Sequence, residues 1–282
     1  MVWTREAARL SCQRGDDMCT LIVRHGLDEW CSTLIAANRD EFYDRPASGP
    51  MMLRDTPQIV GGRDERAGGT WLALTPQGLF VGLTNQRSFA ARDDTLRSRG
   101  DLVVEALSAG TFDGVRRHLE QVDARAYNEF NLIFGDGDQV CAAYGRQTAR
   151  AVELETLGPG VHVLCNDRLG STDFPKADEA RVKVESIAPG PWLRMKPQLI
   201  EVLGDRSLPD PAVLPALPPH ASFDAEVARR LQAICVKTPV YGTVSATLAA
   251  LSPRRVEQYA FCDGPPDEGE FEDVTHLLRI GE

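Results

Sequence analysis

The sequence predicts an α+β protein in which antiparallel sheets are combined with pairs of helices. Apolar, β-branched runs are joined by short turns rich in glycine and aspartate, a pattern typical of antiparallel hairpins. Segments with helical periodicity come in pairs instead of alternating with single strands, which disfavours a doubly wound parallel sheet. The chain has 282 residues, 43% of them hydrophobic, and is long enough to form one large domain.

The first half of the chain contains two predicted hairpins, two helices and a second group of strands. The hairpins comprise residues 19–25 with 30–40, and residues 70–75 with 79–84. Residues 97–122 have helical periodicity, and Gly110 and Thr111 divide them into two helices, with Thr111 suited to cap the second. Strands are predicted again at 130–134, 140–144, 151–157 and 161–165.

The second half is predicted to be mainly helical before it closes in strands. Helices are expected over 176–187, 193–203 and 223–234, a proline-rich loop over 208–219, and strands over 241–251, 256–262 and 272–280. We expect residues 18–282 to form a single domain. Residues 1–17 are polar and contain no apolar stretch, so they do not resemble a secretory signal and are predicted to be an N-terminal extension, disordered or not translated.

Charge and cysteine content exclude several classes of function. The net charge of -10 repels phosphate backbones, so we expect no nucleic-acid partner. No apolar run approaches the roughly 20 residues that span a bilayer, so we expect no stable membrane insertion. The seven cysteines are scattered without a CxxC pair, and no HExxH occurs. We therefore predict no metal site, and a cytoplasmic protein with reduced thiols.

The tripeptide Met18-Cys19-Thr20 is a candidate start of the mature chain. Translation from Met18 and removal of that residue would leave Cys19 first, with its own α-amino group available as a base for its thiol. The alternative is a buried strand cysteine without a chemical role. With translation from Met1, Cys19 is internal unless the leader is removed.

The polar run Asn38-Arg39-Asp40-Glu41 closes the strand that returns from Cys19. Such a cluster is typical of the mouth of a site, where arginine binds an anion and carboxylates accept hydrogen bonds from amines. The alternative is a strand end held by salt bridges.

Paired glycines at 61–62 and 68–69 bracket a polar loop that contains Arg63 and Arg66 and ends at Trp71. Glycines permit close approach to a ligand, or simply tight turns at hairpin ends. Asparagines follow or open further strands at Asn85, Asn131 and Asn166. They are candidate oxyanion donors, or residues that form turns.

Taken in order, several motifs along the chain resemble the NRDE family, also called the transport and Golgi organisation family. These motifs are MCTLIV, AANRDEFYDRPA, GGRD, GGTWLALT, GLTN, YNEFNLIFGD, LCNDRL and TPVYGTVSAT. The resemblance runs from Met18 to about Ile280 and is most specific in the N-terminal third. That family is in turn similar to cysteine N-terminal nucleophile (Ntn) hydrolases such as penicillin V acylases and bile salt hydrolases. The resemblance implies a single-domain αββα sandwich.

In those hydrolases a cysteine attacks an amide, an aspartate steadies the amino group of that cysteine, and asparagines help to hold the oxyanion. Carried over motif by motif, the resemblance implies these roles for Cys19, Asp40, Asn85 and Asn166.

One departure from the family pattern disfavours amide hydrolysis. The family commonly reads YGTRSST near the C-terminus, and the hydrolases carry an arginine in the equivalent strand. Residues 241–247 here read YGTVSAT and contain no arginine. The chain therefore lacks a fixed donor to a transition-state anion, unless Arg39 or Arg63 substitutes for it.

The resemblance also implies a role in haem trafficking or in lipid and acyl-CoA metabolism. We expect a protein that binds and transfers an amphipathic anion, haem or an acyl-CoA, and that requires no cofactor. Its predicted ligand-binding residues are Asn38, Arg39, Glu41, Arg63, Arg66 and Trp71, with an acyl chain held in a gap between the two sheets. An N-terminal cysteine amidohydrolase is the second hypothesis, and an interaction module is the third. The sequence does not predict the oligomeric state.

Overall fold

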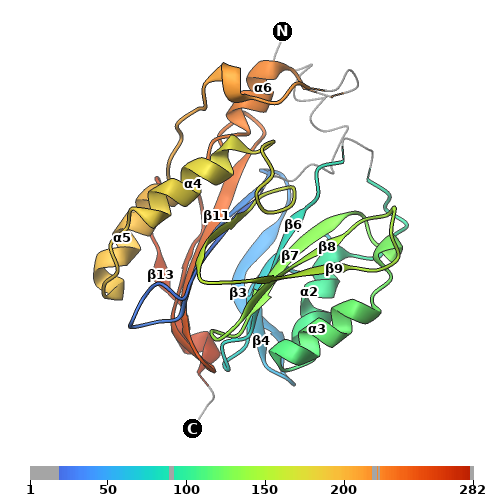
Figure 1. The fold of residues 1–282 in the computed structure, drawn as a ribbon, viewed down its shortest axis with the longest axis vertical. Coiled ribbons are helices and arrows are strands. Elements are labelled where there is room, and N and C mark those ends of the chain that lie inside the picture. The colour runs from blue at the N-terminus through green and yellow to red at the C-terminus, as the bar shows by residue number, and fades with distance from the viewer. Residues whose placement is uncertain (1–18, 89–91, 218–220, 222, 280–282) are drawn as a thin grey trace.

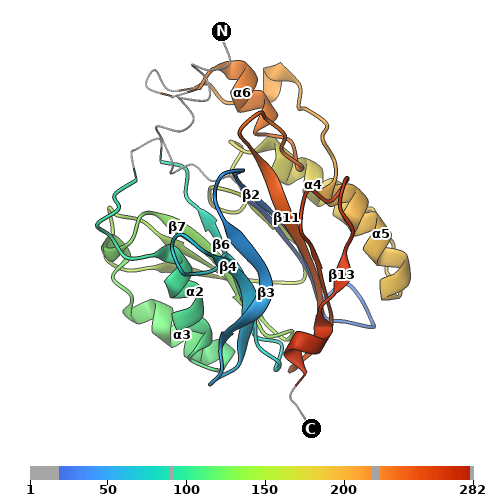
Figure 2. The same cartoon turned by 180° about the vertical axis from the view of Figure 1, so that it is seen from behind.

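In the computed structural model, two antiparallel sheets lie face to face between two layers of helices (Figure 1). The structure describes residues 19–88, 92–217, 221 and 223–279. The predicted extension 1–17 lies outside the described residues. Seen from behind, the helices stay on the two outer faces and the sheets stay in the middle (Figure 2). This layering confirms the predicted α+β class and the sandwich implied by the resemblance.

The first sheet has the strand order β10-β1-β2-β11-β12-β13. Its strands are β1 (Thr20–His25), β2 (Thr33–Phe42), β10 (Gly160–Leu164), β11 (Tyr241–Ser252), β12 (Arg255–Cys262) and β13 (Glu272–Asp273). The N-terminal hairpin of β1 and β2 is the predicted one, and its register places Thr20 opposite Asn38. Cys19, which precedes β1, thereby comes close to the polar end of β2.

The second sheet runs in sequence order from β3 to β9. Its strands are β3 (Ala47–Arg54), β4 (Ile59–Asp64), β5 (Leu72–Leu74), β6 (Phe80–Asn85), β7 (Phe130–Gly135), β8 (Val140–Gly145) and β9 (Glu153–Leu157). β3 and β4 were not predicted. β3 is an edge strand with no buried residue and contains Gly49-Pro50, so it lacks the apolar alternation that marks a strand in sequence.

Helices α2 (Arg99–Leu107) and α3 (Phe112–Gln121) cover the second sheet, and α4 (Pro175–Glu185) and α5 (Trp192–Leu203) cover the first (Figure 1). Thr111 caps α3 as predicted, because its side chain accepts a hydrogen bond from the Gly114 amide. Helix α6 (Ala225–Arg230) is shorter than the predicted helix 223–234. After Leu231, the Gln232 and Ala233 amides bond three residues back, so the α-helix ends there.

The predicted strand over 272–280 is wrong in its greater part. Within the described residues 272–279, only Glu272–Asp273 pairs with β12, and Thr275–Leu278 forms a 3₁₀ helix instead; residue 280 lies outside the described residues. Asp273 accepts a hydrogen bond from the Thr275 amide, and the Thr275 hydroxyl bonds to the backbone of Tyr259. These side-chain contacts turn the chain out of the sheet. Two further 3₁₀ turns lie at Ala124–Ala126 and Pro211–Val213.

Three hydrophobic cores fill the spaces between the four layers. Successive strand residues enter different cores, because side chains alternate across a sheet: Ile22 packs against the helices, and Leu21 packs between the sheets. Buried side chains such as Phe80 and Ile133 fill the space between the sheets. The predicted gap for an acyl chain is therefore occupied by the protein's own core.

Candidate functional site

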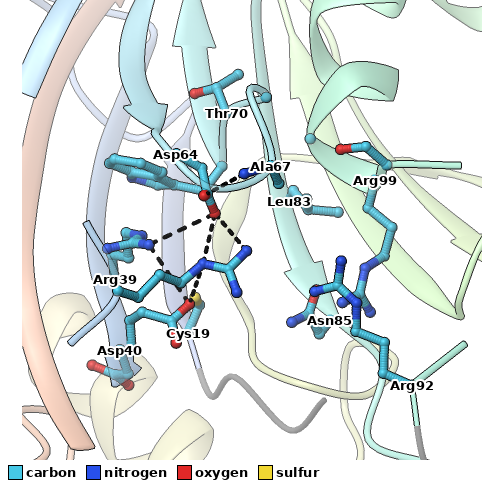
Figure 3. A pocket seen from close by; sticks show the side chains of 16 residues that line it. Cys19, Arg39, Asp40, Asp64, Ala67, Thr70, Leu83, Asn85, Arg92 and Arg99 are labelled. Atoms are coloured by element: carbon cyan, nitrogen blue, oxygen red, sulfur yellow. Dashed lines mark hydrogen bonds and ion pairs between the residues drawn. The ribbon is translucent and has the colours of Figure 1, made fainter. Parts of the chain in front are cut away.

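A cavity of about 70 Å³ lies between the C-terminal end of β2 and the strands β4 to β6 (Figure 3). Its chemically relevant lining residues are Cys19, Arg39, Asp40, Glu41, Arg45, Asp64, Trp71, Asn85, Arg92 and Arg99. A space of this size holds a few waters or one charged group, and is much smaller than a typical site for a whole small molecule.

The strand alternation of β2 divides the motif Asn38-Arg39-Asp40-Glu41 between the two faces of the sheet. The Asn38 amide donates to the carbonyls of Leu203, at 2.8 Å, and Ile234, at 2.9 Å. It therefore faces the helices and does not line the cavity. Arg39 and Glu41 face the second sheet, where the Arg39 guanidinium lies 4.5 Å from the centre of the Trp71 ring.

Two arginines and two carboxylates form an ion-pair network on the cavity side. The Arg45 Nη2 lies 2.7 Å from Asp64 Oδ2, and its Nε lies 3.3 Å from Glu41 Oε2. Arg39 Nη2 lies 3.6 Å from Glu41 and 4.0 Å from Asp64. Burial acts to raise the pKa of Asp64, but the hydrogen bonds from Arg45 and the Ala67 amide outweigh it, and the pKa is lowered. The hydrogen bonds from Arg45 and the Ala67 amide therefore favour the ionised form of the Asp64 carboxylate.

Arg92 and Arg99 form the opposite wall together with Asn85 (Figure 3). Arg92 Nε lies 2.9 Å from Asp94, whose side chain is 86% exposed, and Arg99 donates to the Glu129 carbonyl at 3.1 Å. Four guanidinium groups line the cavity, and of the three acidic lining residues Glu41 and Asp64 direct their carboxylates toward it. Because the carboxylates are concentrated on the β2 side, the wall formed by Arg92 and Arg99 is suited to an anion.

The carboxylate of Asp40 faces away from this network, toward the helix layer. It is fully buried, and its Oδ1 accepts a hydrogen bond from the Thr243 hydroxyl at 2.6 Å. Its Oδ2 lies 3.6 Å from the Nζ of Lys176, a lysine of α4 that is also fully buried. Burial raises the pKa of Asp40 to about 6, against the opposing effects of Lys176 and Thr243.

The structure brings together six of the ten residues predicted from sequence: Cys19, Arg39, Asp40, Glu41, Trp71 and Asn85 all line the cavity. Asn166 lies beside them, since its amide donates to the Asn85 carbonyl at 2.7 Å. The functional roles assigned to these residues stay predictions.

Arg63 and Arg66 do not line the cavity. The Arg63 side chain is 46% exposed and lies 3.8 Å from Glu65, and Arg66 is exposed. The neighbouring glycine pair at 61–62 belongs to β4, where a Cβ on Gly61 would stand 2.5 Å from the Leu72 carbonyl. This glycine therefore permits close packing of strands, the alternative that does not involve a ligand.

Sequence reasoning missed Arg45, Arg92, Arg99 and Lys176. Lys176 had one local signal, because it directly follows Pro175 in the first turn of α4, where a cation is disfavoured by the helix dipole. Arg99, the first residue of α2, had the same signal, whereas Arg45 and Arg92 reach the cavity from loops and carried none.

In the described part of the chain, no group of three or more His, Cys, Asp or Glu side chains could hold a metal ion. None of the described helices is long and apolar enough to cross a membrane.

Comparison with known proteins identifies relatives over most of the chain. A family profile described as Transport and Golgi organisation 2 matches residues 18–260. The bovine Transport and Golgi organization protein 2 homolog is 31% identical over 230 residues, which are 76% of this chain and 80% of that protein. The human homolog is 28% identical over 228 residues, with the same shares covered.

Two solved structures share the fold at low sequence identity. The N-acylethanolamine-hydrolyzing acid amidase ortholog of Caenorhabditis elegans superposes with a TM-score of 0.53 at 14% identity, covering 82% of this chain and 92% of that one. A mutant of the conjugated bile acid hydrolase from Clostridium perfringens gives 0.52 at 9% identity, covering 93% and 95%. The αββα sandwich is therefore Ntn-hydrolase-like.

Proposed function

This chain belongs to the Transport and Golgi organisation 2 family, and on that premise we propose that it binds and transfers an anionic, amphipathic ligand in the cytoplasm. Haem and acyl-CoA are the candidate ligands. The observation that carries the proposal is the wall of Arg92 and Arg99, which faces the ion-pair network across the cavity. A carboxylate or phosphate of the ligand would accept charge-assisted hydrogen bonds from these guanidinium groups.

The size of the cavity limits which part of the ligand enters it. About 70 Å³ accommodates a charged group but neither a macrocycle nor an acyl chain. Because the core between the sheets is filled, the apolar part of the ligand would lie at the cavity mouth. A ligand held mainly by its charged end is accessible to a second protein, which favours transfer over permanent storage.

Titration of the purified protein with haemin and with palmitoyl-CoA tests this function. We expect saturable binding of at least one of them, weakened about tenfold or more in Arg92→Ala and in Arg99→Ala, since each loses a hydrogen bond to a charged group. Arg97→Ala is the matched control, because Arg97 lies between the two in sequence but pairs with Glu105 outside the cavity lining. Absence of saturable binding of both ligands to the wild type would refute the proposal.

The second candidate is an N-terminal cysteine amidohydrolase, which is favoured by the presence of Cys19, Asp40 and Asn85 around one cavity. The Cys19 sulfur would attack the amide carbonyl carbon while its α-amine takes the thiol proton and later delivers it to the departing nitrogen. This chemistry requires a chain that begins at Cys19.

The intact mass of the protein from its native host tests that requirement, because a chain that retains Met18 has no free α-amine on Cys19. If Cys19 is the first residue, a screen of amide substrates follows, with Cys19→Ala as the inactive control. A thiol reagent should then label Cys19 ahead of the buried cysteines. Burial raises the pKa of Cys141 and Cys165 to about 11, so few of those thiols ionise at neutral pH. Equal labelling of several cysteines would contradict a special role for Cys19.

A further inference from the structure

Lys176 is a fully buried lysine directly behind the cavity. Its side chain is 0% exposed, and its Nζ lies 3.6 Å from the Oδ2 of Asp40, which is equally buried. Among the described residues, neither of these two atoms has a hydrogen-bond partner in standard geometry. Lysine is almost never fully buried in proteins unless it is paired, so the Asp40 carboxylate has to account for its position.

The position of Lys176 in its helix makes the burial more costly. It is the second residue of α4, and the positive end of the helix dipole disfavours a cation in the first turn. The desolvation of an ammonium group is a further penalty, which is compensated only by a close opposite charge. Places where a sequence departs from such local rules are often functional or strained.

The groups around Asp40 come from four elements and from the residue that follows β10. Arg39 belongs to the same strand, Thr243 to β11, and Lys176 to α4; Thr20 of β1 and Cys165, which follows β10, complete the surroundings. Burial raises the pKa of the Cys165 thiol to about 11, so this thiol is neutral at pH 7. Arg39 is directed to the cavity side of the sheet, and Lys176 is therefore the cation on the helix side of Asp40.

We propose that Lys176 is a positioning residue of the cavity: its ammonium keeps the Asp40 carboxylate ionised and fixed against the helix face of β2. The neighbouring residues Arg39 and Glu41 then project from the opposite face of β2 into the cavity. The inference deepens the proposed function and rests on it for the link to ligand binding. In this arrangement the cation beside Asp40 comes from Lys176 of α4. Strand β11, in which the family commonly carries an arginine, contributes Thr243 and no arginine.

The direct test is the titration of Asp40 by carbon NMR of protein labelled with ¹³C at the aspartate carboxyl group. The wild type should show a carboxyl signal with a midpoint near pH 6 that is absent in Asp40→Asn. In Lys176→Met the midpoint should move upward by one pH unit or more, and Lys176→Arg should restore it. Lys183→Met is the matched control, because Lys183 lies on the same helix but is 35% exposed and pairs with Glu179 and Asp205.

Ligand binding gives the second readout. The affinity for palmitoyl-CoA at pH 7 should fall about fivefold or more in Lys176→Met and recover in Lys176→Arg, which a loss of packing alone would not explain. An unchanged Asp40 midpoint in Lys176→Met, or an equal shift in Lys183→Met, would overturn the inference.

The NMR titration also decides the inference if Lys176→Met does not fold or if the wild type binds no ligand. If Lys176→Met does not fold, the ¹⁵Nζ signal of Lys176 in the wild type should change with the same midpoint as Asp40, and independent titration would refute the pairing. If the wild type binds neither haemin nor palmitoyl-CoA, the proposed function fails, while the NMR titration still decides whether Lys176 controls Asp40.

Discussion

The two faces of β2 place one short polar motif in opposite environments. On the helix face, Asn38 and Asp40 are buried, with hydrogen bonds to backbone carbonyls and to Thr243, and with Lys176 as the ionic partner. On the sheet face, Arg39 and Glu41 border a cavity and belong to a network in which each arginine lies near two carboxylates.

The helix face of β2 therefore supports the strand, whereas the sheet face is the one that can bind a ligand. On the helix face the Asn38 amide nitrogen and the Asp40 carboxylate have fixed partners away from water, so a change there should act first on stability and on the orientation of the strand. On the sheet face the charges have alternative partners at 2.7 to 4.0 Å, and an incoming anion can compete for them. The following changes test this separation.

Removal of the Lys176 ammonium should have the largest effect. Lys176→Met leaves the Asp40 carboxylate buried without its nearest cation, and we expect the free energy of unfolding to fall by about 3–5 kcal/mol. Urea denaturation measures this loss. The double variant with Asp40→Asn should recover much of the stability, because both charges are then absent. A double variant as unstable as the sum of the single variants would show that the two side chains are not coupled.

Stability should depend on pH through Asp40. Its pKa in the folded protein, about 6, lies above the ordinary value of 3.8. The folded state therefore holds this proton more tightly, and the stabilisation that results is fully present below about pH 4 and is lost as the pH rises through 6. Two pKa units correspond to about 3 kcal/mol.

Denaturation of the wild type and of Asp40→Asn between pH 4 and 7 isolates this contribution from those of the other carboxylates. The wild type should lose about 2.4 kcal/mol relative to the variant as the pH rises over this range, since part of the change already occurs below pH 4. A difference that stays constant, or that changes in the opposite direction, would refute the raised pKa of Asp40.

Substitutions of the adjacent residues Asn38 and Arg39 should have different effects, the first on the free energy of unfolding and the second on ligand affinity. Asn38→Ala removes two hydrogen bonds to buried carbonyls, and we expect a loss of about 2 kcal/mol in unfolding free energy with unchanged palmitoyl-CoA affinity. Arg39→Ala should weaken palmitoyl-CoA binding about tenfold. An equal loss of affinity in both variants would mean that the two faces of β2 act as one site.

The features that the sequence could predict are those that depend on residues close to one another along the chain. The hairpin that brings Cys19 to the motif 38–41 is local, since a short turn and two apolar runs define it. Strand periodicity also implied that residues 38 and 40 face away from 39 and 41, although all four were assigned to one site. Lys176 and Arg99 approach the site from distant helices, and only the packing of helices on sheets determines such contacts.

Arg63 should show the smallest effect of all. Sequence reasoning assigned it to the ligand because arginine suits a phosphate, but it lies on the exposed side of β4 with Glu65 as its partner at 3.8 Å. Exposed ion pairs contribute roughly 0–1 kcal/mol, so Arg63→Ala should change the free energy of unfolding by less than about 0.5 kcal/mol. Its affinity for palmitoyl-CoA should equal that of the wild type, because the side chain does not line the cavity. A tenfold loss of affinity would instead place an anionic group of the ligand beside β4, and would extend the binding surface beyond the cavity that Arg39 borders.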